Sequence, residues 1–220
     1  MDSASLVADA AARLLRDFCD PQTVNRAPDD GWKASAWVGL ERAGLTLAWV
    51  PEEFGGAGGD LADGFGVLRE AGRFATPLPL SETLLAGWLL SRAGITCPKG
   101  ALACAPARNG DRATLASDGT LSGRLRAIAF ASEAKHIAVL AQRTAGGDAV
   151  ALINTSAVQI TRGASIAGDA LDTVTLEGVR PIALTDAPVG LDQRALMLMG
   201  AAARSVEMAG ALEAILDLAV

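Results

Sequence analysis

Glycine is concentrated in one short stretch of the chain, residues 50–60, which reads Val-Pro-Glu-Glu-Phe-Gly-Gly-Ala-Gly-Gly-Asp. Four glycines in five positions predict a backbone with left-handed angles or very close approach by another group. A dinucleotide-binding loop is excluded, because the third glycine of the G-x-G-x-x-G pattern falls on Leu61, and no G-x-x-x-x-G-K-[ST] phosphate loop is present. Taken alone, these residues predict a sharp loop that ends where Asp60 caps the next helix.

The residue types that carry acid–base, nucleophilic or metal chemistry are sparse. His136 is the only histidine, so a histidine-cluster metal site is excluded and we expect no metal site. We expect His136 itself to be a partly exposed residue at the start of a strand. Glu52 and Glu53 are neighbours on an extended segment, so their side chains point apart and a solvated turn is expected.

Composition narrows the class of protein. Half of the 220 residues are hydrophobic and the net charge is −6, which favours a large core and excludes a disordered chain. Basic residues are scattered, so we expect no nucleic-acid partner. The start of the chain is not basic, and Cys19, Cys97 and Cys104 form no CxxC pair. We therefore expect reduced thiols and a cytoplasmic location.

The first part of the chain, residues 1–97, has the period of amphipathic helices. Helices are predicted from the first residues to Phe18, over Trp32–Ala43 with Gly44 as its stop, after Asp60, and over Ser81–Ala93. A polar break is expected over Pro21–Asp30. This part is predicted to be an all-α domain.

After Pro98 the apolar residues alternate with a period of two, and turn signals such as Asn109-Gly110 and Ser122-Gly123 separate them. This pattern over residues 98–188 predicts a domain that is an antiparallel β-sandwich or barrel. Segregated helices and strands place the chain in the α+β class. The seven expected strands are Ala101–Ala105, Arg112–Ala116, Arg126–Phe130, His136–Ala141, Ala149–Ile153, Val158–Thr161 and Thr173–Leu176.

The last segment, residues 189–220, returns to the helical period. Charges such as Arg204 and Glu213 interrupt its apolar run, so we expect a packed helix and no membrane span. The helical pattern still holds at Val220 without a cap, glycine or proline. We therefore expect it to be the first helix of a C-terminal helical bundle, in a chain that stops short of the natural end.

Several motifs resemble those of the acyl-CoA dehydrogenase family. Residues 50–59 resemble the family's (V/I)PEE(Y/F)GGxGG signature, and residues 68–73 resemble its "EELGR" helix end. Residues 76–86 are similar to the "PLPLAETLLA" run of short, divergent bacterial members. The strand-rich region and residues 210–220 correspond to the family's middle domain and the first helix of its C-terminal domain. The resemblance thus covers the whole chain.

The resemblance implies an FAD enzyme that converts an acyl-CoA thioester into an enoyl-CoA, in fatty acid or steroid degradation. It implies electron-transfer flavoprotein as the electron acceptor. Flavin-strand positions fall on Leu102, Cys104, Gly110, Ala127 and Ala129. In the family's pattern, Cys104 and Ala129 would be threonine, Gly110 would be serine and Ala127 would be an aromatic ring. These departures remove polar and aromatic contacts with the flavin.

The same resemblance implies no catalytic base within residues 1–220. In most members the base lies beyond the position of Val220, and in a minority it lies near Gly200, which has no carboxylate. Our leading hypothesis is the degenerate subunit of an α2β2 heteromer with a homologous acyl-CoA dehydrogenase subunit. The alternatives are an active homo-oligomer with a divergent flavin pocket, or a non-enzymatic scaffold that binds CoA esters.

Overall fold

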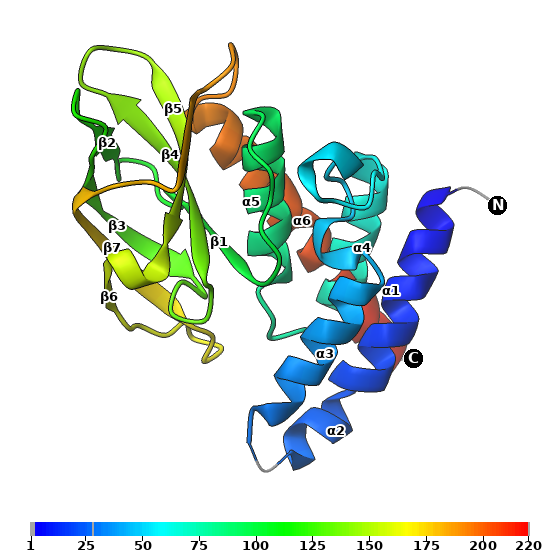
Figure 1. Cartoon of the computed structure of the whole chain (residues 1–220). Helices are drawn as coiled ribbons and strands as arrows, with labels where there is room; N and C mark the ends of the chain where they lie inside the picture. The colour runs from blue at the N-terminus through cyan, green and yellow to red at the C-terminus, as the bar shows by residue number, and fades with distance from the viewer. Residues whose placement is uncertain (1–2, 28, 220) are drawn as a thin grey trace.

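A computed structural model describes residues 3–27 and 29–219 and separates them into helices on one side and a sheet on the other (Figure 1). The long α6 starts beside the sheet and runs behind α5 and α4 towards α1. The helices are α1 Ser3–Cys19, α2 Pro21–Arg26, α3 Gly31–Arg42, α4 Leu61–Arg73, α5 Leu80–Arg92 and α6 Gln193–Ala219. This is the α+β class that the periodicity predicts.

The glycine loop folds back on the segment before it. The Gly58 and Gly59 amides donate to the carbonyls of Val50 and Ala48, each at 2.9 Å. A Cβ at Gly56 would lie 2.0 Å from the Val50 carbonyl oxygen, so no larger residue fits. Asp60 and Asp63 then exchange side-chain and backbone hydrogen bonds of 3.0 Å at the start of α4. The glycines therefore have a structural role, and Asp60 caps the helix as predicted.

The expected polar break over residues 21–30 is wrong in part, because Pro21–Arg26 forms the short α2. Proline is favoured at the first position of a helix, where its missing N–H costs nothing. The other helices agree with the predicted order within a few residues at each end.

The sheet has eight strands among the described residues, in the order β6-β7-β3-β2-β4-β5-β8, with β1 on the other part of β4. The pairs of β1 and β2 with β4 are parallel and the rest are antiparallel, so the sheet is mixed rather than purely antiparallel. The strands are β1 Leu102–Ala105, β2 Ala113–Leu115, β3 Leu121–Ala129, β4 His136–Arg143, β5 Asp148–Asn154, β6 Gln159–Thr161, β7 Leu171–Val179 and β8 Ala183–Asp186.

Strand β3 continues without a break through Ser122-Gly123, where the sequence predicts a turn. The register with β7 shifts beside Gly123, whose backbone passes so close to β2 that a Cβ would lie 2.4 Å from the Arg112 carbonyl oxygen. Glycine marks a bulge here and not the end of a strand.

The two faces of the sheet are buried in different cores. Ile137 and Val139 of β4 point into a core enclosed by the strands, whereas Ala138 and Leu140 point into the core shared with the helices. Burial on both faces explains why β4 and β5 are continuous apolar runs. The helix packed nearest to this face is α5, which contacts β1, β4 and β5.

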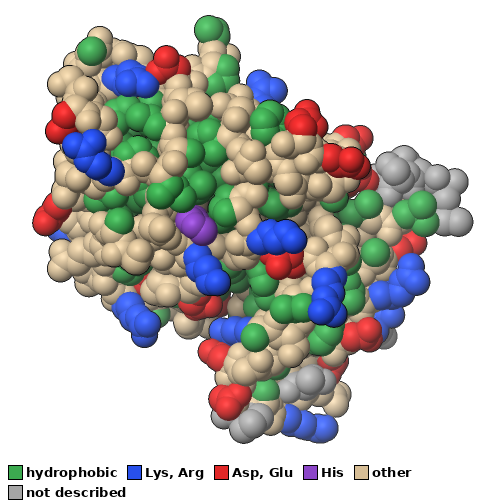
Figure 2. All heavy atoms as spheres, in the orientation of Figure 1, with side chains coloured by type: hydrophobic (Ala, Val, Ile, Leu, Met, Phe, Trp, Pro, Cys, Tyr) green, Lys and Arg blue, Asp and Glu red, His purple; other side chains and the backbone are tan. Residues whose placement is uncertain are grey.

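Helix α6 is long and apolar enough to cross a membrane by length and composition alone. A packing helix passes the same test. Here Glu213 and Asp217 of α6 form ion pairs with Arg69 and Arg73 of α4, so its charged side chains contact a neighbouring helix. On the face drawn in Figure 2, acidic and basic side chains are interspersed, and hydrophobic side chains gather over the sheet.

Candidate functional site

A cavity of about 370 Å³ lies between the sheet and the two helices α5 and α6. We call it the α5–α6 cavity. Most of its lining is apolar and small, and the only charged residues among the described residues that line it are Glu82 and Arg204. The lining residues are Glu82, Leu85, Cys104, Pro106, Ala107, Ala127, Ala129, Leu171, Leu196, Met197, Gly200, Ala201 and Arg204.

Three of the five predicted flavin-strand residues meet in this cavity. Cys104 comes from β1, and Ala127 and Ala129 come from the end of β3. Burial raises the pKa of the Cys104 thiol, so the side chain is a neutral thiol and not a reactive thiolate. Together these three residues form a smooth wall without a side-chain hydroxyl or an aromatic ring.

The other two predicted residues lie elsewhere. Leu102 is fully buried in the helical core, and its amide donates to Thr83 Oγ1 at 3.0 Å. Gly110 lies in the exposed loop between β1 and β2, with a φ of +97° and open space where a Cβ would point. Neither residue lines the α5–α6 cavity.

A bulge in β3 brings both alanines to the cavity. The register with β7 shifts between Leu125 and Ile128, and Ala127 has a φ of +56°. A non-glycine residue in this left-handed region costs about 1–2 kcal/mol. The distortion re-aims the end of the strand, as bulges beside functional sites do.

The charged side of the cavity joins α5 to α6. Arg204 donates one hydrogen bond to Glu82 and another of 2.7 Å from Nη1 to Glu207 Oε2, and Ser81 donates to the second oxygen of Glu207. The Glu82 side chain is only 7% exposed. Burial raises the pKa of the Glu82 carboxyl, and the positive charge of Arg204 opposes that rise. Burial alone would lower the pKa of Arg204, but the two carboxylates outweigh burial and raise it.

No pattern in the sequence indicates this cluster. Glu82 lies in the first turn of a helix. An acidic side chain there is expected to be exposed to solvent and to interact favourably with the helix dipole. Its partner Arg204 is 122 residues away. Only packing of α6 on α5 shows that the carboxylate is buried.

Gly200 also lines the cavity, at the position where the resemblance places a base in a minority of the family. A Cβ there would lie 3.6 Å from Leu85 Cδ2, an ordinary contact, so the position has room for a side chain. His136, at the start of β4, does not line the cavity.

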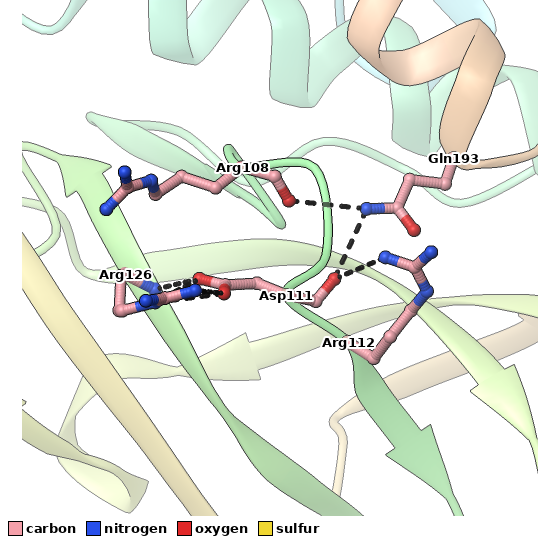
Figure 3. A network of polar contacts seen from close by, with 5 residues as sticks. All are labelled: Arg108, Asp111, Arg112, Arg126 and Gln193. Carbon is pink, nitrogen blue, oxygen red and sulfur yellow. Dashed lines mark hydrogen bonds and ion pairs between the residues drawn. The ribbon is translucent and has the colours of Figure 1, made fainter.

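A polar network fixes the loop that borders the cavity (Figure 3). Asp111 accepts hydrogen bonds from the Arg126 backbone at 2.6 Å and from Arg126 Nε at 3.0 Å, and the Arg126 side chain holds the pKa of this carboxyl below its usual value. Gln193 Nε2, at the start of α6, donates to the carbonyls of Arg108 and Asp111 at 3.4 and 3.2 Å. The network therefore ties the β1–β2 loop to both β3 and α6.

A second, larger cavity of about 470 Å³ lies between α3 and the start of β1. Lys33, Trp37, Lys99 and Lys135 are among its lining residues. None of the five predicted flavin-strand residues lines it, so the α5–α6 cavity is the better candidate site.

The helical part of the chain is similar in sequence to known proteins. The family model described as acyl-CoA dehydrogenase, N-terminal domain, matches residues 1–96. The protein named acyl-CoA dehydrogenase IpdE2 from Mycolicibacterium smegmatis is 38% identical over 96 residues, which are 42% of this chain and 31% of that protein. The matched part is thus about a third of the curated relative's length.

Solved structures match over almost the whole chain. The ChsE4-ChsE5 complex from Mycobacterium tuberculosis matches with a TM-score of 0.78 and 19% identity, over 99% of this chain and 65% of that chain. PigA with FAD and proline matches with a TM-score of 0.74 and 18% identity, over 99% of this chain and 67% of that chain. Identities this low show the fold alone. Residues 1–96 are therefore similar to the acyl-CoA dehydrogenase N-terminal domain, and the described chain has the fold of the larger proteins that it matches.

Proposed function

We propose that this protein is a subunit of an FAD-dependent acyl-CoA dehydrogenase, and that it is the degenerate partner in a heteromer with a homologous chain. When bound, FAD supplies the chemistry of hydride acceptance from the β-carbon of an acyl-CoA thioester. The sequence of residues 1–96 supports the family, and the PigA structure with FAD supports the cofactor. The ChsE4-ChsE5 structure is a complex of two differently named chains, which supports the heteromer.

The wall formed by Cys104, Ala127 and Ala129 carries the proposal of degeneracy. Small side chains leave room for a flat ring against β3, and the cavity is within the size range of ligand pockets. The same residues give the polar edge of a flavin no side-chain hydroxyl. A buried polar edge without partners costs about 1–3 kcal/mol for each group. The wall thus fits the shape of the ring but offers no side-chain hydrogen bonds to its polar edge. In this proposal a homologous partner supplies those hydrogen bonds.

Among the described residues that line the α5–α6 cavity none has a free carboxylate, and this points the same way. Gly200 has no side chain, and Glu82 is held by Arg204. We therefore place the base outside the described residues, in the partner or in another part of the protein. Electron-transfer flavoprotein as the acceptor and a cytoplasmic location remain part of this proposal on the strength of the family resemblance.

Visible absorption of the purified natural protein tests the proposal. The protein is purified alone and together with its candidate homologous partner, and the flavin content of each sample is measured. Flavin bands only in the complex are expected. Flavin bound by this protein alone, with reduction by an acyl-CoA, would instead establish the active homo-oligomer. CoA-ester binding without flavin in either sample would establish the scaffold.

The substitution Ala129→Thr sharpens the test. It restores the hydroxyl that the resemblance places at this position, and one added hydrogen bond is worth about 0.5–1.5 kcal/mol. We expect flavin affinity to rise by about 3- to 10-fold. Ala129→Val has nearly the same shape without the hydroxyl and is the control. An equal effect of both variants would show that Ala129 does not face the flavin edge.

A further inference from the structure

The polar cluster of Ser81, Glu82, Arg204 and Glu207 links α5 to α6 and also borders the α5–α6 cavity. Glu82 and Arg204 both line the α5–α6 cavity, and the side chain of Glu82 is otherwise enclosed by protein. A guanidinium has more N–H donors than the two that Arg204 uses here. About half of the Arg204 side chain, 53%, is still accessible. The cluster therefore offers hydrogen-bonding capacity to whatever occupies the cavity.

The rest of the cavity is apolar. Leu85, Leu196 and Met197 lie on the same two helices as the charged pair, and alanines and Leu171 form the opposite side on β3 and β7. An occupant with a plain hydrocarbon end would displace water from the charged pair and would form no hydrogen bond in place of that water. Sites built to hydrogen-bond a ligand oxygen discriminate strongly against analogues that lack it.

The charges of the cluster indicate which kind of oxygen fits. Arg204 is the only cation in the cluster, and it faces the two carboxylates of Glu82 and Glu207. A ligand carboxylate would add a third anion to one cation. A neutral oxygen avoids this repulsion, because a ketone or hydroxyl can accept from Arg204 and a hydroxyl can also donate to Glu82.

We propose that the acyl group bound in the α5–α6 cavity carries a neutral oxygen, a ketone or a hydroxyl, that hydrogen-bonds to the Glu82–Arg204 pair. This inference rests on the proposed acyl-CoA dehydrogenase function and adds the substrate class. It makes Glu82 and Arg204 specificity-determining residues in addition to a link between α5 and α6.

Flavin reduction by matched thioesters tests the proposal. The natural holoenzyme, with any homologous subunit that accompanies it, is mixed without oxygen with CoA thioesters of equal carbon number. One has an unsubstituted acyl chain, one set has a ketone or hydroxyl at successive distal carbons, and one has a distal carboxylate. We expect at least one ketone or hydroxyl ester to exceed the unsubstituted ester about tenfold in kcat/KM, with the carboxylate ester the poorest.

A paired substitution separates specificity from structure. Removing one partner would strand a buried charge, whereas replacing both with apolar residues of similar volume is often tolerated. In the variant Glu82→Leu with Arg204→Met we expect the preference for the oxygenated ester to disappear or to reverse. Met197→Leu changes the same cavity without its polarity and is expected to keep the preference. Melting temperatures of all variants report any structural effect separately.

The outcomes are distinct. Equal or better turnover of the unsubstituted ester by the natural enzyme would overturn this inference and leave the proposed function intact. An oxygen preference that survives the paired substitution would also overturn it, because the preference would then come from other residues. A flavin-free protein, or one whose flavin no thioester reduces, would overturn both.

Discussion

At the scale of single residues, Asp111 is a buried carboxylate whose charged form depends on Arg126. Its side chain is 4% exposed and receives hydrogen bonds from both the backbone and the guanidinium of Arg126. Because the folded-state pKa lies below the unfolded value, this carboxylate stabilises the fold above the unfolded pKa of about 4, and the stabilisation is lost as the pH falls through the lower folded pKa.

We expect Asp111→Asn to lower the free energy of unfolding by about 1.5–3 kcal/mol at neutral pH, the range for hydrogen bonds to charged groups. Urea denaturation at pH 7 and at the lowest pH where the protein is folded measures the effect, which should shrink in acid. Asp186→Asn removes an ion pair with Arg143 whose carboxylate is 82% exposed, and we expect less than about 1 kcal/mol. Equal losses in the two variants would refute the special role of Asp111.

At the scale of elements, α4 and α6 cross with their backbones in contact. A Cβ at Gly72 would lie 2.0 Å from the Glu207 carbonyl oxygen, and a Cβ at Gly210 would lie 1.9 Å from that of Arg69. Ion pairs from Arg69 to Glu213 and from Arg73 to Asp217 flank this crossing. Glycine is needed at both positions because the opposing atoms belong to main chain that cannot rotate away.

We expect Gly210→Ala to destabilise the protein by at least about 1–3 kcal/mol, since the added methyl forces the helices apart. Gly200→Ala lies on the same helix and meets only an ordinary contact with Leu85, so better helix propensity should stabilise it by up to about 1 kcal/mol. Thermal unfolding followed by circular dichroism compares the two. Similar melting temperatures for both variants would contradict the close crossing.

At the scale of the whole molecule, the far half of α6 presents an apolar surface. Met208, Leu212, Ile215 and Leu216 are each 61–64% exposed, and Leu218 is 88% exposed. Contiguous apolar surface of this kind marks an interaction site or promotes aggregation. The surface continues along the helix that also lines the α5–α6 cavity.

We expect the polypeptide of residues 1–220 to self-associate when expressed alone. Leu212→Glu with Ile215→Glu should shift it towards the monomer, as measured by analytical ultracentrifugation. Ile182→Glu, at a position that is 56% exposed in the strand-rich part, is the control and should leave self-association unchanged. A wild-type polypeptide that stays monomeric and melts sharply would contradict this prediction.

Local chemistry was sufficient to predict most of the elements in their order and several of their ends, although the short α2 and the strand β8 were not predicted. Asp60 as a helix cap, Gly44 as a helix stop and the switch from helical to alternating periodicity near residue 98 all depend on neighbours in the chain. The glycine loop was also predictable, although only the structure shows that the Val50 and Ala48 carbonyls fill the space a side chain would need.

Tertiary structure decided the features that join distant segments. The parallel pairing of β1 and β2 with β4, the burial of Glu82 against Arg204 and the close approach of Gly72 and Gly210 to main chain all couple residues far apart in sequence. No local propensity encodes such pairs, because an isolated glutamate or glycine has the same preferences whatever packs on it later. The sequence by itself thus determined the fold class and the local caps and turns, whereas the polar end of the cavity exists only because α6 packs across α5.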